Sequence, residues 1–411
     1  MVRVGRYTAA LVVLATGIAL LMDLLNGSEL LLAGLEYWPV LLIALGLEYV
    51  IAGIRARSGE PKVKLDFGPL ILAVVIALAV SGFSHGKAFL DKIDAPYQIP
   101  FGWGPQVEYE KPVQRVPLRD GTDKIVIHNP VGDVSVIAGS GDQVEIRPVV
   151  LVRRQLGPEE AEQIVRDSEV KVTKGSTMLI EAEGGEYRNY ILFTHKAAVR
   201  LVVVIPEDRA VDVEVETASG DIRMDGIAVR DSWTLDTNNG DIEVANLSGE
   251  GTAETMNGDV KAERVKGPVR MSTLNGDIRV QNADGDVNVK TANGDITIES
   301  VSGNLAAETN NGDVEIMESL GGLQVETANG EIDISASRVG GDWTVETKHG
   351  DIEIRLPEDG DYRVNAESRN GGASTDISGL AEERNGIQGT VGSGEYRIGI
   401  SGGKVDIRAY E

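Results

Sequence analysis

Carboxylates in a repeated glycine turn are the residues of this sequence best placed to do chemistry. The motif Thr-x-x-Gly-Asp/Glu-Ile/Val recurs from residue 217, with its glycine at positions 220, 240, 258, 276, 294, 312, 330 and 350. The acidic residues of the motif are Asp221, Asp241, Asp259, Asp277, Asp295, Asp313, Glu331 and Asp351. If the repeats stack, these like charges lie close together. Their repulsion must then be offset by hydrogen bonds from the amides of their own turns or by a bound cation.

Calcium is the cation to weigh, because it takes clustered oxygen ligands and some solenoids bind it through glycine-aspartate turns. Those calcium repeats carry Gly-Gly-x-Gly-x-Asp at nine-residue spacing. Here one Gly-Asp occurs per repeat of mostly eighteen residues, without the preceding pair of glycines. We therefore predict no cofactor and no metal, with calcium at the aspartate column as the alternative, which an unchanged melting temperature in EDTA would exclude.

Two further residue types keep a fixed place in the repeat and predict structural ladders. The threonine positions are Thr217, Thr237, Thr255, Thr273, Thr291, Thr309, Thr327 and Thr347. The asparagine positions are Asn239, Asn257, Asn275, Asn293, Asn311 and Asn329. Stacked asparagine side chains can hydrogen-bond to one another along a ladder and also satisfy turn amides.

Residues suited to nucleophilic or metal-dependent catalysis are few. The chain has no cysteine, and its four histidines, His85, His128, His195 and His349, are widely scattered. We predict no catalytic residues and no enzyme. Carboxylate pairs are abundant, so a glycan-acting solenoid enzyme stays open as an alternative. Such an enzyme normally interrupts its own regularity around a catalytic groove, whereas these turns are short and uniform.

The elements that position these residues are short strands. A second glycine falls nine residues after the first in five units, and apolar residues two apart, such as Ile296 and Ile298, follow each turn. Each unit of about eighteen residues is therefore two half-buried strands and two turns. A parallel coil and an antiparallel meander could both use such units. The constant period favours the parallel β-solenoid, because one inserted residue would break every column of a coil.

The flanking segments are less regular. We assign residues 119–210 to an irregular β lead-in that caps the solenoid, with one helix from Pro158 to about Ser168. The regular solenoid covers 211–359, and 360–411 form a C-terminal β cap. Residues 84–118 hold five prolines and are predicted to be an extended linker.

The first 83 residues predict a membrane anchor of three helices. Apolar runs of 19, 18 and 17 residues occupy positions 7–25, 37–54 and 67–83, each long enough to cross a hydrocarbon core. Basic residues precede the first run and fill the loop at 55–66, so the N-terminus and that loop are expected in the cytoplasm and the large domain outside it. Glu48 lies inside the second run, where a carboxylate carries function or reaches towards the interface.

The charge distribution limits the partners. Residues 1–66 carry six basic and six acidic residues, so the net charge of −25 lies entirely in the remainder. Nucleic acid and anionic lipid surfaces are therefore unfavourable direct partners for the large domain.

The repeat T-x-N-G-D-[IV]-x-[IV], preceded by a strand-helix-strand region ending VVVIP, resembles the bacterial "putative adhesin" family of uncharacterised β-solenoid proteins over roughly residues 120–400. The segment YWPVLLIALGLEYVI, residues 37–51, is similar to the transmembrane module of the LiaI and LiaF envelope-stress proteins, although Glu48 departs from its apolar pattern. These resemblances imply a protein of the bacterial cell envelope and supply no catalytic residues.

The sequence therefore predicts a non-enzymatic scaffold or adhesin-like interaction protein, anchored in the bacterial cell membrane and binding envelope proteins or copies of itself. An envelope-stress sensor that signals through its transmembrane helices is the alternative.

Overall fold

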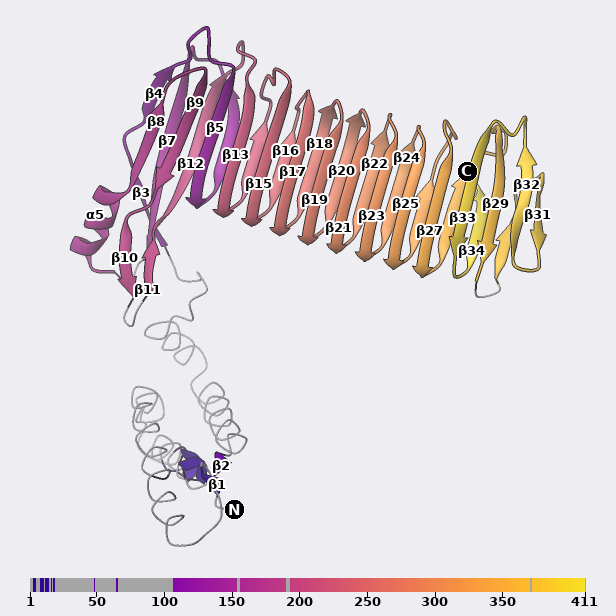
Figure 1. Ribbon diagram of the computed structural model, residues 1–411, viewed down its shortest axis with the longest axis horizontal. Coiled ribbons are helices and arrows are strands. Elements are labelled where there is room, and N and C mark those ends of the chain that lie inside the picture. Colours follow the sequence, from indigo (N-terminus) through magenta and orange to yellow (C-terminus); the bar gives the residue numbers. More distant parts are fainter. Residues whose placement is uncertain are drawn as a thin grey trace. The chain divides into compact units, whose positions relative to one another are not determined.

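A computed structural model of the chain describes residues 3–4, 8–10, 12–14, 16, 18, 48, 64–65, 106–153, 156–189, 193–369 and 372–410. The chain divides into two compact units, Met1–Pro105 and Gln106–Glu411. The second unit is a long stack of strands that run side by side, from β4 at one end to β31 at the other (Figure 1).

The stack contains two sheets, and successive strands of the chain alternate between them. The regular strands of the first sheet are β14 (Ile222–Asp225), β16 (Ile242–Ala245), β18 (Val260–Lys266), β20 (Ile278–Asp284), β22 (Ile296–Val301), β24 (Val314–Ser319), β26 (Ile332–Ser335) and β28 (Ile352–Leu356). The regular strands of the second sheet are β13 (Asp212–Ser219), β15 (Ser232–Asn239), β17 (Glu250–Asn257), β19 (Val269–Asn275), β21 (Val287–Asn293), β23 (Leu305–Asn311), β25 (Leu323–Asn329) and β27 (Trp343–His349).

Neighbouring strands in both sheets are parallel and in register. Ile278 pairs with Ile296 in the first sheet, and Val287 pairs with Leu305 in the second. Each residue therefore lies beside its counterpart in the next coil, eighteen positions away in most coils and twenty in the first and last of the regular ones. The prediction of a parallel β-solenoid is confirmed, because an antiparallel meander would pair these strands in opposite directions.

The core lies between the two sheets. In β22 the side chains of Ile296 and Ile298 are fully buried while Thr297 between them is partly exposed. This alternation repeats along the stack and produces one continuous apolar cluster from Val116 to Ile407. Burying each aliphatic side chain contributes roughly 1.5–3 kcal/mol, so the core is the main source of stability.

A left-handed kink interrupts the alternation in four strands of the first sheet and directly after β16. It lies at Asn246, Arg264, Asn282, Ser300 and Glu318, all with φ between 53° and 60°. After the kink the following residue points inward again; Val265 and Val301 are both 1% exposed. This left-handed conformation suits asparagine and strains other side chains.

The N-terminal end of the stack begins earlier than residue 211. Strand β5 (Lys124–Val131) pairs in parallel with β13, and β6 (Val134–Gly139) pairs in parallel with β14. Two strands of the predicted lead-in therefore belong to the coil itself.

The rest of the lead-in closes this end by changing strand direction. Strand β7 (Gln143–Arg153) is antiparallel to β12 (Ala198–Pro206), and β8 (Glu169–Thr173) is antiparallel to β9 (Thr177–Glu183). Helix α5 (Pro158–Asp167) forms where the sequence predicts it and buries Ala161 and Ile164 against β7. A separate hairpin joins β10 (Glu186–Asn189) to β11 (Phe193–Lys196).

The predicted linker ends too late. Strands β3 (Gln106–Glu110) and β4 (Gln114–Pro117) both pair antiparallel with β7, so residues 106–117 are part of the folded unit. The linker was predicted from its prolines, but these are compatible with the strands. Pro112 lies between β3 and β4, and Pro117 ends β4 at the edge of a sheet, where a missing amide is tolerated.

At the other end, β33 (Tyr396–Gly402) and β34 (Val405–Ala409) continue the parallel ladders from β27 and β28. Strand β29 (Tyr362–Ser368) follows β33, and β30 (Ala373–Thr375) follows β34. The antiparallel strands β32 (Gly386–Val391) and β31 (Leu380–Glu383) then end the second sheet. The parallel ladders therefore extend beyond residue 359 into the predicted C-terminal cap, residues 360–411, and the antiparallel strands β32 and β31 lie at its end.

In the first unit, β1 (Arg3–Val4) pairs in parallel with β2 (Lys64–Leu65), and residues 8–10, 12–14, 16, 18 and 48 are helical. No helix within the described residues combines the length and the apolar character that a bilayer span needs. The predicted spans at 7–25, 37–54 and 67–83 fall almost entirely outside the described residues.

Candidate functional site

The glycine-aspartate turns join the end of each second-sheet strand to the next first-sheet strand, so their residues form columns along one edge of the stack. The glycine is required by close approach. Gly276 has φ +157°, and a side chain there would place its Cβ 2.0 Å from the carbonyl oxygen of Gly258 in the preceding coil.

The aspartates form a continuous ladder of hydrogen bonds. The backbone amide of Asp277 donates to Oδ1 of Asp259 at 2.9 Å, and the amide of Asp295 donates to Oδ1 of Asp277 at 2.9 Å. Every predicted site aspartate, Asp241, Asp259, Asp277, Asp295 and Asp313, takes part in this ladder. The expectation that each carboxylate bonds its own turn is wrong: the donor is one coil further on, because parallel stacking places that amide directly beside the carboxylate.

This arrangement reduces the need for a cation. Each ladder carboxylate already accepts a backbone amide, and its exposed position lets water screen the remaining charge. In the part of the chain that the structure describes, no group of three or more acidic or histidine side chains lies close enough to hold a metal ion.

The asparagines form a second ladder beside the first. Nδ2 of Asn293 donates to Oδ1 of Asn275 at 3.0 Å, and Nδ2 of Asn311 donates to Oδ1 of Asn293 at 2.9 Å. The same contact joins each of the predicted asparagines, Asn239, Asn257, Asn275, Asn293, Asn311 and Asn329. All six are exposed, so this ladder is a surface feature.

The threonines lie on the buried side of the same edge. Oγ1 of Thr291 donates to the carbonyl oxygen of Gly276 at 3.0 Å, and this bond recurs from coil to coil at Thr237, Thr255, Thr273, Thr309, Thr327 and Thr347. Thr217 is buried and its hydroxyl has no hydrogen-bond partner. Asn129 lies opposite Thr217, and its Nδ2 donates to the carbonyl of Gly132, the counterpart of the Gly220 carbonyl that accepts from Thr237.

The columns therefore start one coil before the predicted one. Asp133 accepts the amide of Asp221 at 3.2 Å, and Asn129 lies opposite Thr217. The sequence contains this extra coil as Asn129-Pro-Val-Gly-Asp133-Val134, a variant of the repeat motif. Its aspartate lies 88 positions before the next one in the column, Asp221. At the other end Lys404 replaces the aspartate, and its amide donates to Oδ1 of Asp351 at 2.8 Å.

A second, shorter ladder lies at the opposite turn and was missed. The amide of Asn304 donates to Oδ1 of Asp286 at 2.8 Å, and the amide of Gly322 donates to Oδ1 of Asn304 at 3.1 Å. Aspartate, asparagine and glycine occupy the equivalent positions of this ladder. Because no residue type repeats, the sequence pattern does not predict it.

The outer face of the second sheet is acidic near its N-terminal end. Glu216, Asp236 and Glu254 occupy successive positions of one row. Partial burial, together with the neighbouring charges of Glu254 and Glu216, raises the pKa of Asp236. A row of three carboxylates is unfavourable for binding phosphate groups.

The two histidines whose side chains the structure describes do not come together. Nε2 of His128 lies 3.6 Å from Glu216 in the first coil, and His349 lies opposite Asn329 at the far end of the asparagine column. The side chain of His195 and all of His85 lie outside the described residues.

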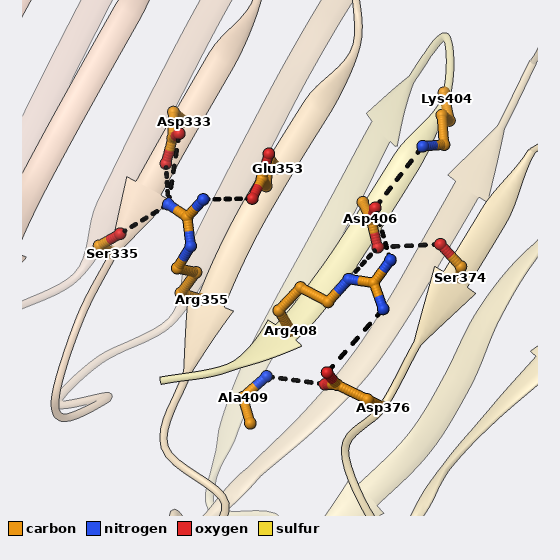
Figure 2. A network of polar contacts seen from close by, with 10 residues as sticks. All are labelled: Asp333, Ser335, Glu353, Arg355, Ser374, Asp376, Lys404, Asp406, Arg408 and Ala409. Atoms are coloured by element: carbon orange, nitrogen blue, oxygen red, sulfur yellow. Dashed lines mark hydrogen bonds and ion pairs between the residues drawn. The ribbon is translucent and has the colours of Figure 1, made fainter. Parts of the chain in front are cut away.

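A polar network covers the C-terminal end of the first sheet (Figure 2). Arg355 contacts Asp333, Ser335 and Glu353. Oδ1 of Asp406 accepts hydrogen bonds from Nε of Arg408 at 2.8 Å and from Oγ of Ser374 at 2.9 Å. Nζ of Lys404 lies 3.5 Å from Oδ2 of the same carboxylate. Burial by itself raises the pKa of Asp406, but the hydrogen bonds from Ser374 and Arg408 and the charges of Arg408 and Lys404 bring it below its usual value.

Glu48, in the second predicted span, contacts Thr8 in the first. Its Oε2 accepts the backbone amide of Thr8 at 2.9 Å and the Thr8 hydroxyl at 2.5 Å. The carboxylate thus holds two segments of the first unit together.

With this geometry established, comparison with known proteins identifies the family. Residues 113–288 and 263–408 match the profile of the Toastrack DUF4097 family. The chain belongs to the Toastrack DUF4097 family. The match covers the whole coil and agrees with the "putative adhesin" β-solenoid resemblance stated above. The similarity to LiaI and LiaF stays a prediction, since the family match begins after that segment.

Three solved structures are distantly similar to this chain. A "putative cell adhesion protein" of Clostridium sporogenes is 11% identical, covering 74% of this chain and 99% of its own, with a TM-score of 0.22. A "putative lipid binding protein" of Parabacteroides distasonis is 12% identical, covering 73% and 96%, with a TM-score of 0.33. A "putative adhesin" of Bacteroides fragilis is 13% identical, covering 76% and 98%, with a TM-score of 0.29. No curated protein matches the chain.

Proposed function

We propose that this Toastrack protein is a non-enzymatic, adhesin-like interaction module of the bacterial cell envelope, held at the membrane by its N-terminal helices. The observation that carries the proposal is the in-register ladder, which gives the second unit extended faces edged by rows of identical asparagine and aspartate side chains. Such faces suit the binding of envelope components or of further copies of the chain, because repeated rows offer the same contact several times.

Membrane attachment rests on the three apolar runs at 7–25, 37–54 and 67–83. The pairing of Arg3 with Lys64 supports the proposed topology, since both residues are assigned to the cytoplasmic side. The domain from residue 106 onward then lies outside the cytoplasm.

The test is the location and the partners of the full chain in a bacterial cell. We expect the chain to sediment with membranes, and protease added to spheroplasts to digest the C-terminal unit while leaving an N-terminal fragment. Crosslinking on intact cells should then capture envelope proteins or a second copy. A chain found in the cytosol, or one that crosslinks to nothing at the surface, would overturn the proposal.

A second candidate, an envelope-stress sensor, is favoured by the contact between Glu48 and Thr8. A carboxylate that joins two membrane segments could transmit a change in their packing. If this role holds, Glu48→Ala removes a reporter response to envelope stress, whereas Glu48→Gln, which keeps an acceptor for Thr8, retains most of it. A response unchanged in a chain without residues 1–83 rules the role out.

A further inference from the structure

A groove runs across the strands on the second sheet, beside the turn that carries the short Asp286–Asn304 ladder. It has a volume of about 510 Å³ and extends from Glu250 to Thr344. Its lining comes from six neighbouring strands, β17, β19, β21, β23, β25 and β27, which pair in register. Five steps of about 4.8 Å give a trough on the order of 24 Å long.

The side chains that face the groove include five uncharged hydrogen-bonding groups, and the charged ones are Glu250, Arg270, Asp286 and Asp342. Equivalent positions along its wall hold Thr252, Arg270, Asn288, Ala306, Gln324 and Thr344. The aliphatic residues beneath them are buried: Val287 and Leu305 are each 2% exposed. The groove therefore offers amide and hydroxyl groups at a regular spacing, beside small apolar patches such as those at Pro268 and Ala306.

This chemistry excludes several ligand classes. A lipid or another apolar molecule would meet apolar patches that polar and charged side chains such as Arg270, Asp286 and Gln324 interrupt. An extended peptide could not add as a strand, because the backbone groups beneath the groove are already used in the parallel ladders. A polyanion would meet Glu250, Asp286 and Asp342 against the single cation Arg270.

We propose that this groove binds an extended, non-acidic glycan strand laid across the coils. Amide and hydroxyl side chains exchange hydrogen bonds with sugar hydroxyl and acetamido groups, and the repeating rows contact successive sugars. The inference rests on the proposed function, because it names the class of envelope component that an exposed solenoid face would hold. The lining contains no aromatic side chain on which a sugar ring could stack, so each contact is weak. The affinity then comes from the number of sugars that the groove contacts at once.

The experiment measures binding of chitohexaose and cellohexaose to the full chain by calorimetry, with the trisaccharides and polygalacturonate alongside. We expect a hexasaccharide to bind more tightly than its trisaccharide and polygalacturonate not to bind. Asn288→Ala and Gln324→Ala each remove an exposed amide for which the described residues provide no hydrogen-bond partner. Each should weaken hexasaccharide binding by about tenfold or less, the effect of losing one or two hydrogen bonds.

A matched pair of variants separates the groove from the rest of the sheet. Ala306→Arg fills the groove on β23, whereas Ala328→Arg adds the same side chain on β25 outside the lining residues. We expect loss of binding in the first and wild-type binding in the second, with equal melting temperatures. Absence of binding by both hexasaccharides, or equal binding by the two arginine variants, would overturn the inference. If the chain still reaches the cell surface and crosslinks there, the proposed function survives that failure.

Discussion

At the scale of single residues, the buried threonine column depends on one hydroxyl bond per coil, and one member lacks it. Thr291 donates to the carbonyl of Gly276, whereas the equivalent hydroxyl of Thr217 is buried without a partner. We expect Thr291→Val to lower the free energy of unfolding by about 1–2 kcal/mol, because it leaves a carbonyl unpaired. Thr217→Val should be neutral or stabilising. Urea denaturation of both variants tests this, and equal losses would contradict the assignment of the column.

The asparagine ladder is exposed, so each of its members contributes less than a buried bond does. Asn293 donates to Asn275 and accepts from Asn311. We expect Asn293→Ala to destabilise the fold by about 1 kcal/mol. Asn288→Ala, an exposed asparagine on the same strand β21 but outside the ladder, is the control and should change the melting temperature little.

At the scale of elements, the left-handed kink in the first sheet places non-glycine residues at positive φ. Ser300 has φ +60°, where Asn246 and Asn282 occupy the equivalent place in other coils. Asparagine adopts this conformation more easily than serine, so we expect Ser300→Asn to raise the free energy of unfolding by about 0.5 kcal/mol. Thr297→Asn, in the extended part of β22, should lower it; a loss of stability in both would argue against strain at the kink.

The C-terminal cap should weaken in acid. The pKa of Asp406 is lowered in the fold, so its contribution is present above the unfolded value of about 3.9 and is lost as the pH falls through the folded value. Asp406→Asn should lower the melting temperature at neutral pH and flatten its decline below pH ~5. Glu315→Gln, on an exposed carboxylate of the same sheet, serves as the control; a pH profile that Asp406→Asn leaves unaltered would refute the role.

At the scale of the whole molecule, in-register stacking has a consequence for deletions. The coil should tolerate the loss of one complete winding, but not a deletion that is one residue shorter or longer. Val280 pairs with Ile298, eighteen residues on. Removing residues 280–297 places Ile298 where Val280 stood, so we expect a folded, somewhat less stable rod. Removing residues 280–296 places Thr297 there instead and turns Ile298 outward, which should prevent folding. Circular dichroism and size-exclusion chromatography distinguish the two, and equal behaviour would mean that the rows are not in register.

The sequence by itself determined the period, the strand faces and the columns, because in a parallel coil the sequence neighbour at eighteen residues is also the spatial neighbour. Asn293 and Ile298 could therefore be assigned to a ladder and to the core from spacing alone. The same reasoning placed helix α5, whose proline and acidic first turn are local signals.

Only the tertiary structure decided what depends on residues far apart in the chain. Asp133 joins Asp221 across an insertion, Asp286 and Asn304 share a ladder without sharing a residue type, and β3 and β4 pair with β7 despite their prolines. The direction of the aspartate bonds also came from the fold. A carboxylate bonds whichever amide the stacking brings nearest, and in this protein that amide belongs to the next coil.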